Sequence, residues 1–138
     1  MHFTVKDWMI DLVVFVDPDV PVSEALAVMR RRYIHSLIVN RKEGFPNYGI
    51  LTSTDICDKI IAQGNNPSHT KVRDICTAPL ITVLPTMSLQ ECASVMNQHR
   101  FHHLPVADKD GNLLGMISAT DFLVAAESMG RADGERIV

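Results

Sequence analysis

Short apolar runs alternate with segments of helical spacing along the chain, and this pattern predicts a mixed α/β fold. Residues 12–16 and 80–84 are rich in β-branched residues and end near a proline, which favours extended strands. Loops at 41–47 and 108–112 are typical of hairpin turns. Further strands are expected on either side of these loops, at residues 37–39, 48–51, 104–106 and 113–117.

Helices are expected between and after these strands. Pro21 suits a first helical turn, and Ser88 with Glu91 could form a capping box. A second pair of helices is predicted from near Thr52 to Gly64 and from near Ser118 to Gly130, because glycine commonly ends a helix. The first pair follows from apolar residues at helical spacing: Val22, Ala25, Leu26 and Met29, and Leu89, Cys92, Ala93 and Met96.

The two halves of the chain are copies of one unit. After a shift of 67 residues, ten of the 35 positions from 5 to 39 are identical, where average composition gives about two. Beyond one extra loop residue in the first copy, a shift of 66 places Gly49, Thr54 and Asp55 on Gly115, Thr120 and Asp121. We therefore expect βαββα units at residues 1–64 and 71–130, a linker at 65–70 and a polar C-terminal tail at 131–138.

One such unit, with a three-stranded sheet and two helices, is too small to bury its apolar sheet face alone. We expect the two units to bury these faces against each other about a pseudo-two-fold axis. Two equivalent clefts would then form where the copies meet, which is where ligand pockets tend to lie.

The sharpest motif is a glycine, two apolar residues and then Ser/Thr-x-x-Asp, at residues 49–55 and 115–121. Its first hydroxyl residue lies where a strand passes into a helix, and free N–H groups and the helix dipole favour an anion there. Asp55 or Asp121 could accept two hydrogen bonds from a ribose diol. The hydroxyls that could donate to a phosphate are those of Thr52, Thr54, Ser118 and Thr120.

The same motif is also nearly a helix capping box, so its residues could serve only to begin a helix. Its duplication favours a ligand role, and the two roles are compatible. The starts of the strands in H-S-L-I-V (35–39) and H-H-L-P-V (102–106) are a second candidate, because an anion favours a charged imidazole. His35, Ser36, His102 and His103 could face a phosphate, although His35 and His102 could instead only end a helix.

Composition limits the partners and the compartment. The chain of 138 residues has a formal net charge of −3, so a nucleic-acid polymer is not an expected partner. Its cysteines, Cys57, Cys76 and Cys92, form no Cys-x-x-Cys pair, which favours a reducing compartment. We find no signal-peptide pattern and no apolar stretch near the roughly 20 residues that a membrane span needs. We therefore expect a cytoplasmic protein with no membrane partner.

A metal centre or a catalytic site is not expected. Zinc ligands at His99, His102 and His103 would have to converge, whereas residues 102 and 103 point to opposite faces of an extended strand. The sequence has no Gly-x-Ser-x-Gly elbow and no thiol beside a recognisable base. Met29 and Met96 are expected to fill the core. An enzyme is therefore the weakest of the functional hypotheses.

Taken together, these features resemble a tandem pair of cystathionine-β-synthase (CBS) domains, a Bateman module. The resemblance spans residues 3–126 and implies a stand-alone, non-catalytic pair of two CBS units. It implies that AMP, ADP, ATP or S-adenosylmethionine binds in the cleft between the copies, and that two modules form a homodimer. The matching segments are V-K-D-W-M (5–9), V-R-D-I-C (72–76), I-T-V-L-P (81–85), H-H-L-P-V (102–106) and the two Gly…Ser/Thr-x-x-Asp segments.

The resemblance also implies a role for each motif residue. Asp55 and Asp121 would hold the ribose hydroxyls. Thr82 and Val83, or Phe15 and Val16, would approach the base. The residues that would approach the phosphates are Thr52, Thr54, Ser118 and Thr120 with His35, Ser36, His102 and His103. In the first copy, Ile38 replaces the usual proline, Ser36 a basic residue and Phe15 the threonine found at 82. A bulky Phe15 could block the adenine slot, so the Asp121 pocket is favoured.

We therefore expect a regulatory module that senses an adenosyl ligand and acts on an unknown regulated protein. The alternative is a ligand-free dimerisation or scaffold module, in which the motif residues only cap helices.

Overall fold

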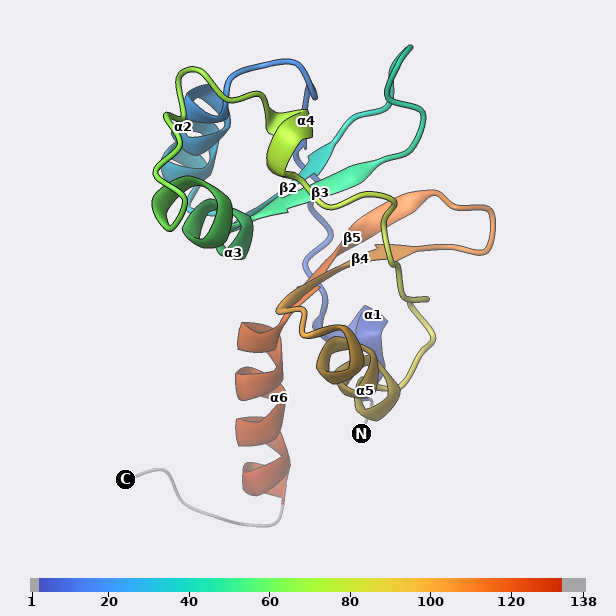
Figure 1. Cartoon of the computed structure of the whole chain (residues 1–138). Coiled ribbons are helices and arrows are strands. Elements are labelled where there is room, and N and C mark those ends of the chain that lie inside the picture. The colour runs from blue at the N-terminus through green and yellow to red at the C-terminus, as the bar shows by residue number, and fades with distance from the viewer. Residues whose placement is uncertain (1–2, 133–138) are drawn as a thin grey trace. The chain divides into compact units, whose positions relative to one another are not determined.

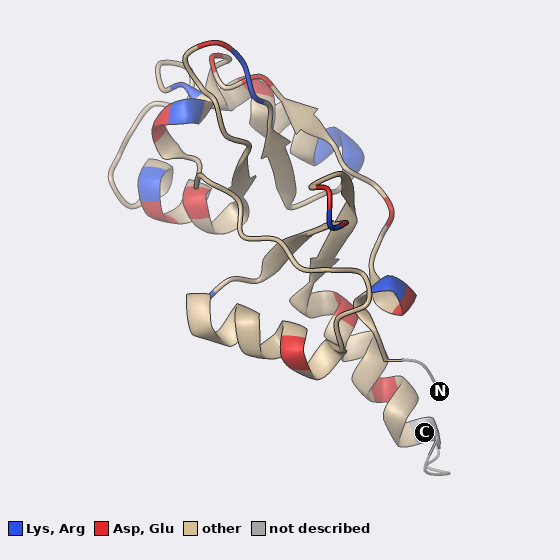
Figure 2. Ribbon diagram, turned by 90° about the vertical axis from the view of Figure 1, so that its right-hand side faces the viewer, with Lys and Arg blue, Asp and Glu red and all other residues tan. Residues whose placement is uncertain are grey.

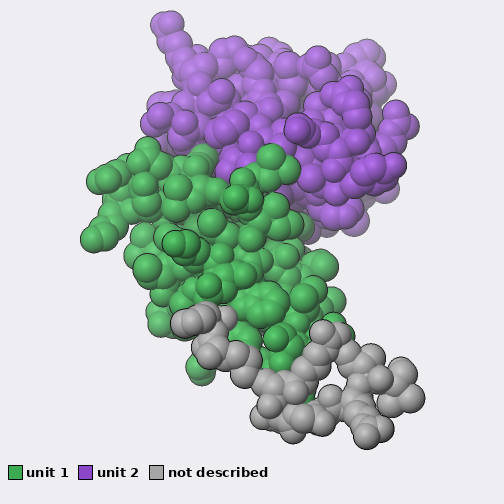
Figure 3. Space-filling view, turned by 180° about the vertical axis from the view of Figure 1, so that it is seen from behind, with its two compact units in different colours: residues 1–12, 81–138 green, residues 13–80 purple. Residues whose placement is uncertain are grey.

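Two compact units make up the computed structural model, which describes residues 3–132 of the chain (Figure 1). Unit 1 contains the residues up to 12 and those from 81 onward, and unit 2 contains residues 13–80 (Figure 3). The N-terminal segment of each sequence repeat is therefore packed in the unit that holds the rest of the other repeat. The repeat boundaries at 1–64 and 71–130 stay a prediction from the sequence, and the packing divides the chain differently.

Unit 2 is built on a three-stranded sheet. β1 (Phe15–Val16) pairs in parallel with β2 (Ser36–Val39), and β2 pairs antiparallel with β3 (Gly49–Thr52). Its helices are α2 (Val22–Arg32), α3 (Ser53–Asp55) with the π-helical stretch η1 (Ile56–Ile61), and α4 (Val72–Ile75). Buried apolar side chains from these elements form one core: Val22, Ala25, Met29, Leu37, Leu51, Ile60, Val72 and Ile75.

Unit 1 repeats this plan with a smaller sheet. β4 (His103–Ala107) and β5 (Leu113–Ser118) form an antiparallel hairpin, and Val83 adds a single parallel bridge to Val106. The helices are α1 (Val5–Trp8), α5 (Leu89–His99) and α6 (Ala119–Ala132). The core contains Val5, Val83, Leu89, Cys92, Met96, Leu104, Val106, Ile117 and Ala125.

Most of the predicted elements are confirmed. The differences lie at the ends of elements, at 80–84, where no strand forms, and in the short helices α1 and α4, which the sequence did not predict. The predicted strands at 12–16 and 80–84 shorten to β1 and to the bridge at Val83. Pro21 is the N-cap of α2 rather than a residue of its first turn. The prediction that Gly130 ends the last helix is wrong, because α6 continues to Ala132, whereas Gly64 has the left-handed φ of +69° expected after a helix. Of the predicted C-terminal tail, residues 133–138 lie outside the described residues.

Residues 3–12 and 71–80 are the exchanged segments, because each packs in the unit that holds the rest of the other repeat. Each is held by backbone pairing to a strand of that unit. Ile10 bridges Met116 of β5, and Thr77 bridges Ile50 of β3, with N···O distances of 2.8–2.9 Å in both pairs. This approach leaves little space beside the motif glycines. A Cβ on Gly115 would lie 2.3 Å from the carbonyl oxygen of Ile10, and one on Gly49 would lie 3.0 Å from that of Thr77. The glycine that opens each motif is thus required by chain packing.

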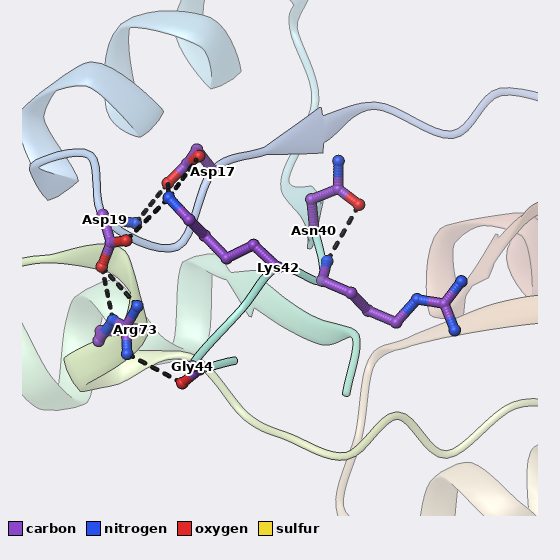
Figure 4. A network of polar contacts seen from close by, with 7 residues as sticks. Asp17, Asp19, Asn40, Lys42, Gly44 and Arg73 are labelled. Atoms are coloured by element: carbon purple, nitrogen blue, oxygen red, sulfur yellow. Dashed lines mark hydrogen bonds and ion pairs between the residues drawn. The ribbon is translucent and has the colours of Figure 1, made fainter. Parts of the chain in front are cut away.

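A charged network ties three segments of unit 2 together (Figure 4). Lys42 pairs with Asp17 at 3.2 Å and with Asp19 at 2.9 Å, and Arg73 of α4 pairs with Asp19 at 2.6 Å. The hydrogen bond from Lys42 lowers the pKa of Asp19, and the backbone N–H of Asp19 lowers the pKa of Asp17. Because the side chains of these four residues are 30–48 % exposed, the network orients the loop and α4 more than it stabilises them.

Charges of both signs are mixed along the chain, and α5 and α6 carry few of them (Figure 2). In the described part of the chain, no helix combines the length and the apolar character that crossing a bilayer requires.

Alanine substitutions at the two motif glycines test the close approach of the exchanged segments. Gly115→Ala is expected to lower the free energy of unfolding by about 2–3 kcal/mol, because the new methyl group would overlap a backbone oxygen. Gly49→Ala is expected to cost only about 1 kcal/mol, since its neighbours need to move by a few tenths of an ångström. Urea denaturation of both variants checks the order, and an equal or reversed order would contradict the packing.

Candidate functional site

Both repeats form the same turn where a strand passes into a helix. Thr52 ends β3, and its N–H donates to Asp55 Oδ2 at 3.0 Å and its Oγ1 to the same oxygen at 3.3 Å. Ser118 ends β5, and its N–H and Oγ donate to Asp121 Oδ2 at 2.8 and 3.2 Å. Each aspartate therefore serves as the N3 residue of a helix cap, as the capping alternative predicted.

The hairpin register brings the second group of predicted residues to the same turns. Ser36 lies opposite Thr52 in the β2–β3 pair, and His103 lies opposite Ser118 in the β4–β5 pair. Ser36, Thr52 and Asp55 are thus neighbours in unit 2, and His103, Ser118 and Asp121 are their counterparts in unit 1. The sequence motifs, although far apart along each repeat, converge at one end of each hairpin.

The neighbouring histidines contribute their backbone to these turns. The carbonyl of His35 accepts the N–H of Ser53 at 3.2 Å, and that of His102 accepts the N–H of Ala119 at 2.9 Å. The first N–H of each helix is therefore satisfied within the protein. The second N–H, on the exposed residue Thr54 or Thr120, is one that no turn of its own helix can satisfy.

The two aspartates differ in what surrounds them. Asp55 is only 7 % exposed, and its Oδ1 also accepts from Lys59 Nζ at 3.1 Å and from Thr77 Oγ1 at 3.4 Å. Asp121 is half-buried, and among the described residues only Ser118 donates to it. The carboxylate of Asp121 is therefore the one with acceptor capacity to spare.

The residues expected near a base are not equally accessible. Val83 is buried, and its N–H and carbonyl bond to Pro105 and Ala107 at 3.0 Å each, so Thr82 is the exposed member of that pair. In unit 2, Val16 is buried and Phe15 is 45 % exposed. The ring of Phe15 lies 6.0 Å from that of Tyr48, and the Arg41 guanidinium covers Tyr48 at 4.4 Å. The place of Thr82 is thus taken in unit 2 by Phe15, whose ring is tilted by 48° against that of Tyr48.

Sequence reasoning missed an apolar pocket that recurs in both units at equivalent positions. It measures 360 Å³ in unit 2 and 380 Å³ in unit 1. Tyr33 follows the end of α2 with a left-handed φ of +54°, and Arg100 follows the end of α5 with a φ of +57°. Each lines the pocket of its unit. One sign of these pockets was present in the sequence. Met29, Tyr33 and His35 have the same spacing as Met96, Arg100 and His102. The other lining residues are Leu26, Arg30, Ile34, Ser53 and Ile56, and Ala93, Asn97, Phe101, Ala119 and Phe122.

The cysteines and histidines of the described residues were candidates for a metal site, and the cysteines also for a reactive thiol. No three His, Cys, Asp or Glu residues between 3 and 132 gather closely enough to hold a metal ion. Burial raises the pKa of the Cys92 thiol to about 11, and it also raises the pKa of Cys76. These two thiols are therefore poor nucleophiles near neutral pH.

The comparison with protein families finds a match in each repeat. The model of the CBS domain matches residues 5–62 and 72–128. The chain belongs to the CBS-domain family. This CBS domain pair is 31 % identical over 132 residues to the CBS domain-containing protein YhcV of Bacillus subtilis, and the match covers 94 % of the chain and 91 % of YhcV. It spans about half, 48 %, of an uncharacterised Methanopyrus kandleri protein, to which it is 34 % identical over 95 residues, or 69 % of the chain.

Solved structures share the fold over nearly the whole CBS pair. The hexameric CBS-CP12 protein from bloom-forming cyanobacteria has a TM-score of 0.84 and 29 % identity, covering 99 % of this chain and 78 % of that one. The CBS domain pair of protein MJ0100, solved with 5′-methylthioadenosine and S-adenosyl-L-methionine, has a TM-score of 0.78 and 22 % identity, covering 91 % and 97 %. The prediction of two CBS repeats with a mixed α/β fold is confirmed.

The unequal surroundings of the two aspartates predict unequal costs of removing them. Asp121→Ala is expected to lower the free energy of unfolding by about 1 kcal/mol, the usual cost of a lost helix cap. Asp55→Ala is expected to cost about 2–3 kcal/mol, because it also removes the charged partner of the partly buried Lys59 ammonium and leaves it the Ile75 carbonyl. Urea denaturation measures both, and equal costs would contradict the network around Asp55.

Proposed function

We propose that this CBS pair is a non-catalytic regulatory module that binds an adenosyl ligand through the turn at Ser118–Asp121. The observation that carries the proposal is the open carboxylate of Asp121 in a turn that also holds hydroxyl and imidazole groups. A vicinal diol offers two O–H donors, and a carboxylate with free acceptor positions can take both. Ligands with a ribose and an adenine, of the AMP, ADP, ATP or S-adenosylmethionine class, satisfy this requirement.

Groups for the rest of the ligand lie near that carboxylate. Thr120 is exposed and contributes a hydroxyl and an N–H for which its own helix has no carbonyl, and His103 lies beside Ser118 across the hairpin. Hydroxyl and N–H donors at a helix start are suited to a phosphate or another anion. Exposed Thr82 and His102 are the remaining candidates in this unit. The MJ0100 pair, which has the same fold, was solved with two adenosyl compounds, and this supports the proposed ligand class.

Ligand binding would act on a regulated protein by favouring one conformational state of the module. A ligand shifts such an equilibrium only by its difference in affinity for the two states. The three cysteines of the described residues are free thiols, which favours a reducing compartment such as the cytoplasm as the place where the protein acts.

A ligand-free dimerisation module is the second candidate. One observation favours it, because both motifs already have a structural use as helix caps. It predicts that no nucleotide stabilises the fold. By contrast, a ligand at a hundred times its dissociation constant would add about 2.7 kcal/mol.

Calorimetry with AMP, ATP and S-adenosylmethionine tests the ligand site. Asp121→Ala is expected to weaken binding about tenfold to a hundredfold, because it removes a charged acceptor worth about 1.5–3 kcal/mol. Asp74→Ala, which removes an exposed carboxylate from α4, serves as the control and should bind like the wild type. Equal affinities of Asp121→Ala and wild type would remove the site from consideration.

We also propose that the module is a homodimer whose contact includes the apolar side chains that α6 leaves exposed. Leu123, Val124 and Met129 are 70 %, 54 % and 41 % exposed. Apolar side chains grouped on one helix are characteristic of association surfaces. The cyanobacterial relative is described as hexameric, so self-association occurs among structures of this similarity.

Light scattering after gel filtration tests the dimer. Leu123→Lys is expected to shift the mass toward that of one chain, because a charged side chain would have to be buried in the contact. Leu114→Lys on the β5 hairpin, at a side chain that is 37 % exposed, is the matched control and should leave the mass unchanged. A monomeric wild type, or a dimeric Leu123→Lys variant, would contradict the proposed contact.

A further inference from the structure

The two aspartate turns are chemically unequal although their sequence motifs match. An ionised carboxylate has two oxygens with about four acceptor positions. In unit 2, four donors reach Asp55: the N–H and Oγ1 of Thr52 at 3.0 and 3.3 Å, Lys59 Nζ at 3.1 Å and Thr77 Oγ1 at 3.4 Å. The carboxylate is thus saturated inside the protein.

Asp121 has about half of its capacity free. Its Oδ2 accepts from the N–H and Oγ of Ser118, and no other described residue donates to it. Two differences in sequence account for this. In unit 1, Ala125 stands at the position of Lys59 and Ile10 at the position of Thr77. Neither side chain has a hydrogen-bond donor.

Lys59 is fixed in place by more than its ion pair. Its Nζ also donates to the carbonyl of Ile75 at 2.7 Å, which links η1 to the end of α4. Its side chain is 37 % exposed and that of Asp55 is 9 % exposed, so the pair lies at the edge of the core. An incoming diol would have to displace an ammonium that already has two oxygen partners.

We propose that Lys59 is a built-in counterion that closes the Asp55 turn, so that the chain takes one adenosyl ligand, through Asp121. This inference rests on the proposed function and identifies Lys59 as the residue that sets the number of ligands. Three substitutions give unit 2 the residues that unit 1 has at these positions. Lys59→Ala and Thr77→Ile free two acceptor positions on Asp55, and Phe15→Thr opens the place of the base.

Calorimetric titration of the full chain with AMP, ATP and S-adenosylmethionine measures the number of sites. The wild type is expected to bind one ligand per chain, and the triple variant Phe15→Thr, Lys59→Ala, Thr77→Ile to bind close to two. The double variant Phe15→Thr, Thr77→Ile, which keeps Lys59, should bind one. Lys109→Ala removes an equal charge from an exposed loop position and should still bind one. Two sites in the wild type, one site in the triple variant, or two sites in the double variant that keeps Lys59 would overturn the inference.

A second measurement needs no ligand. A double-mutant cycle compares the effect of Asp55→Asn in the wild type with its effect in Lys59→Met. The change in the unfolding equilibrium constant should be roughly fivefold larger, or more, in the wild type. If none of the three compounds binds to any variant, the proposed ligand function fails, and the cycle alone decides the counterion role. Additive effects in the cycle would overturn that role.

Discussion

Both units depend on one hydrogen bond, in which the last residue of a strand donates its N–H to the aspartate three residues later. This hydrogen bond also starts the helix that follows. The same contact fixes the hydroxyl residue, the opposing strand start and the carboxylate at one end of each hairpin. The structural and the chemical uses of the motif are therefore two consequences of one geometry, and what differs is how much of the carboxylate the protein itself occupies.

Packing explains the first residue of the motif without any ligand. Gly49 and Gly115 lie where the N-terminal segment of the other repeat crosses a strand, and a side chain there would meet a backbone oxygen. The buried residues Val5 and Val72 then complete cores to which the rest of their own repeats do not belong. Duplication therefore produced two units that each need a segment of the other copy.

The sequence was sufficient for the repeat, the order of the strands and longer helices, and the position of both turns, because these follow from local spacing and from capping chemistry. It did not predict the short helices α1 and α4. It did not predict that α6 passes Gly130, because helix ends depend on packing as well as on propensity. It also missed the saturation of Asp55, which depends on Thr77 and the Ile75 carbonyl, some twenty residues away. The charged network of Asp17, Asp19, Lys42 and Arg73 likewise joins residues that no motif connects. Such contacts between distant segments leave no periodic signal in one sequence.

A crystal structure of the chain grown with ATP or S-adenosylmethionine would show which aspartate holds the ligand. We expect ribose hydroxyls within hydrogen-bonding distance of the Asp121 carboxylate, while the ammonium of Lys59 remains on Asp55. Ribose bound to Asp55, or an adenosyl ligand bound with no contact to Asp121, would contradict this expectation.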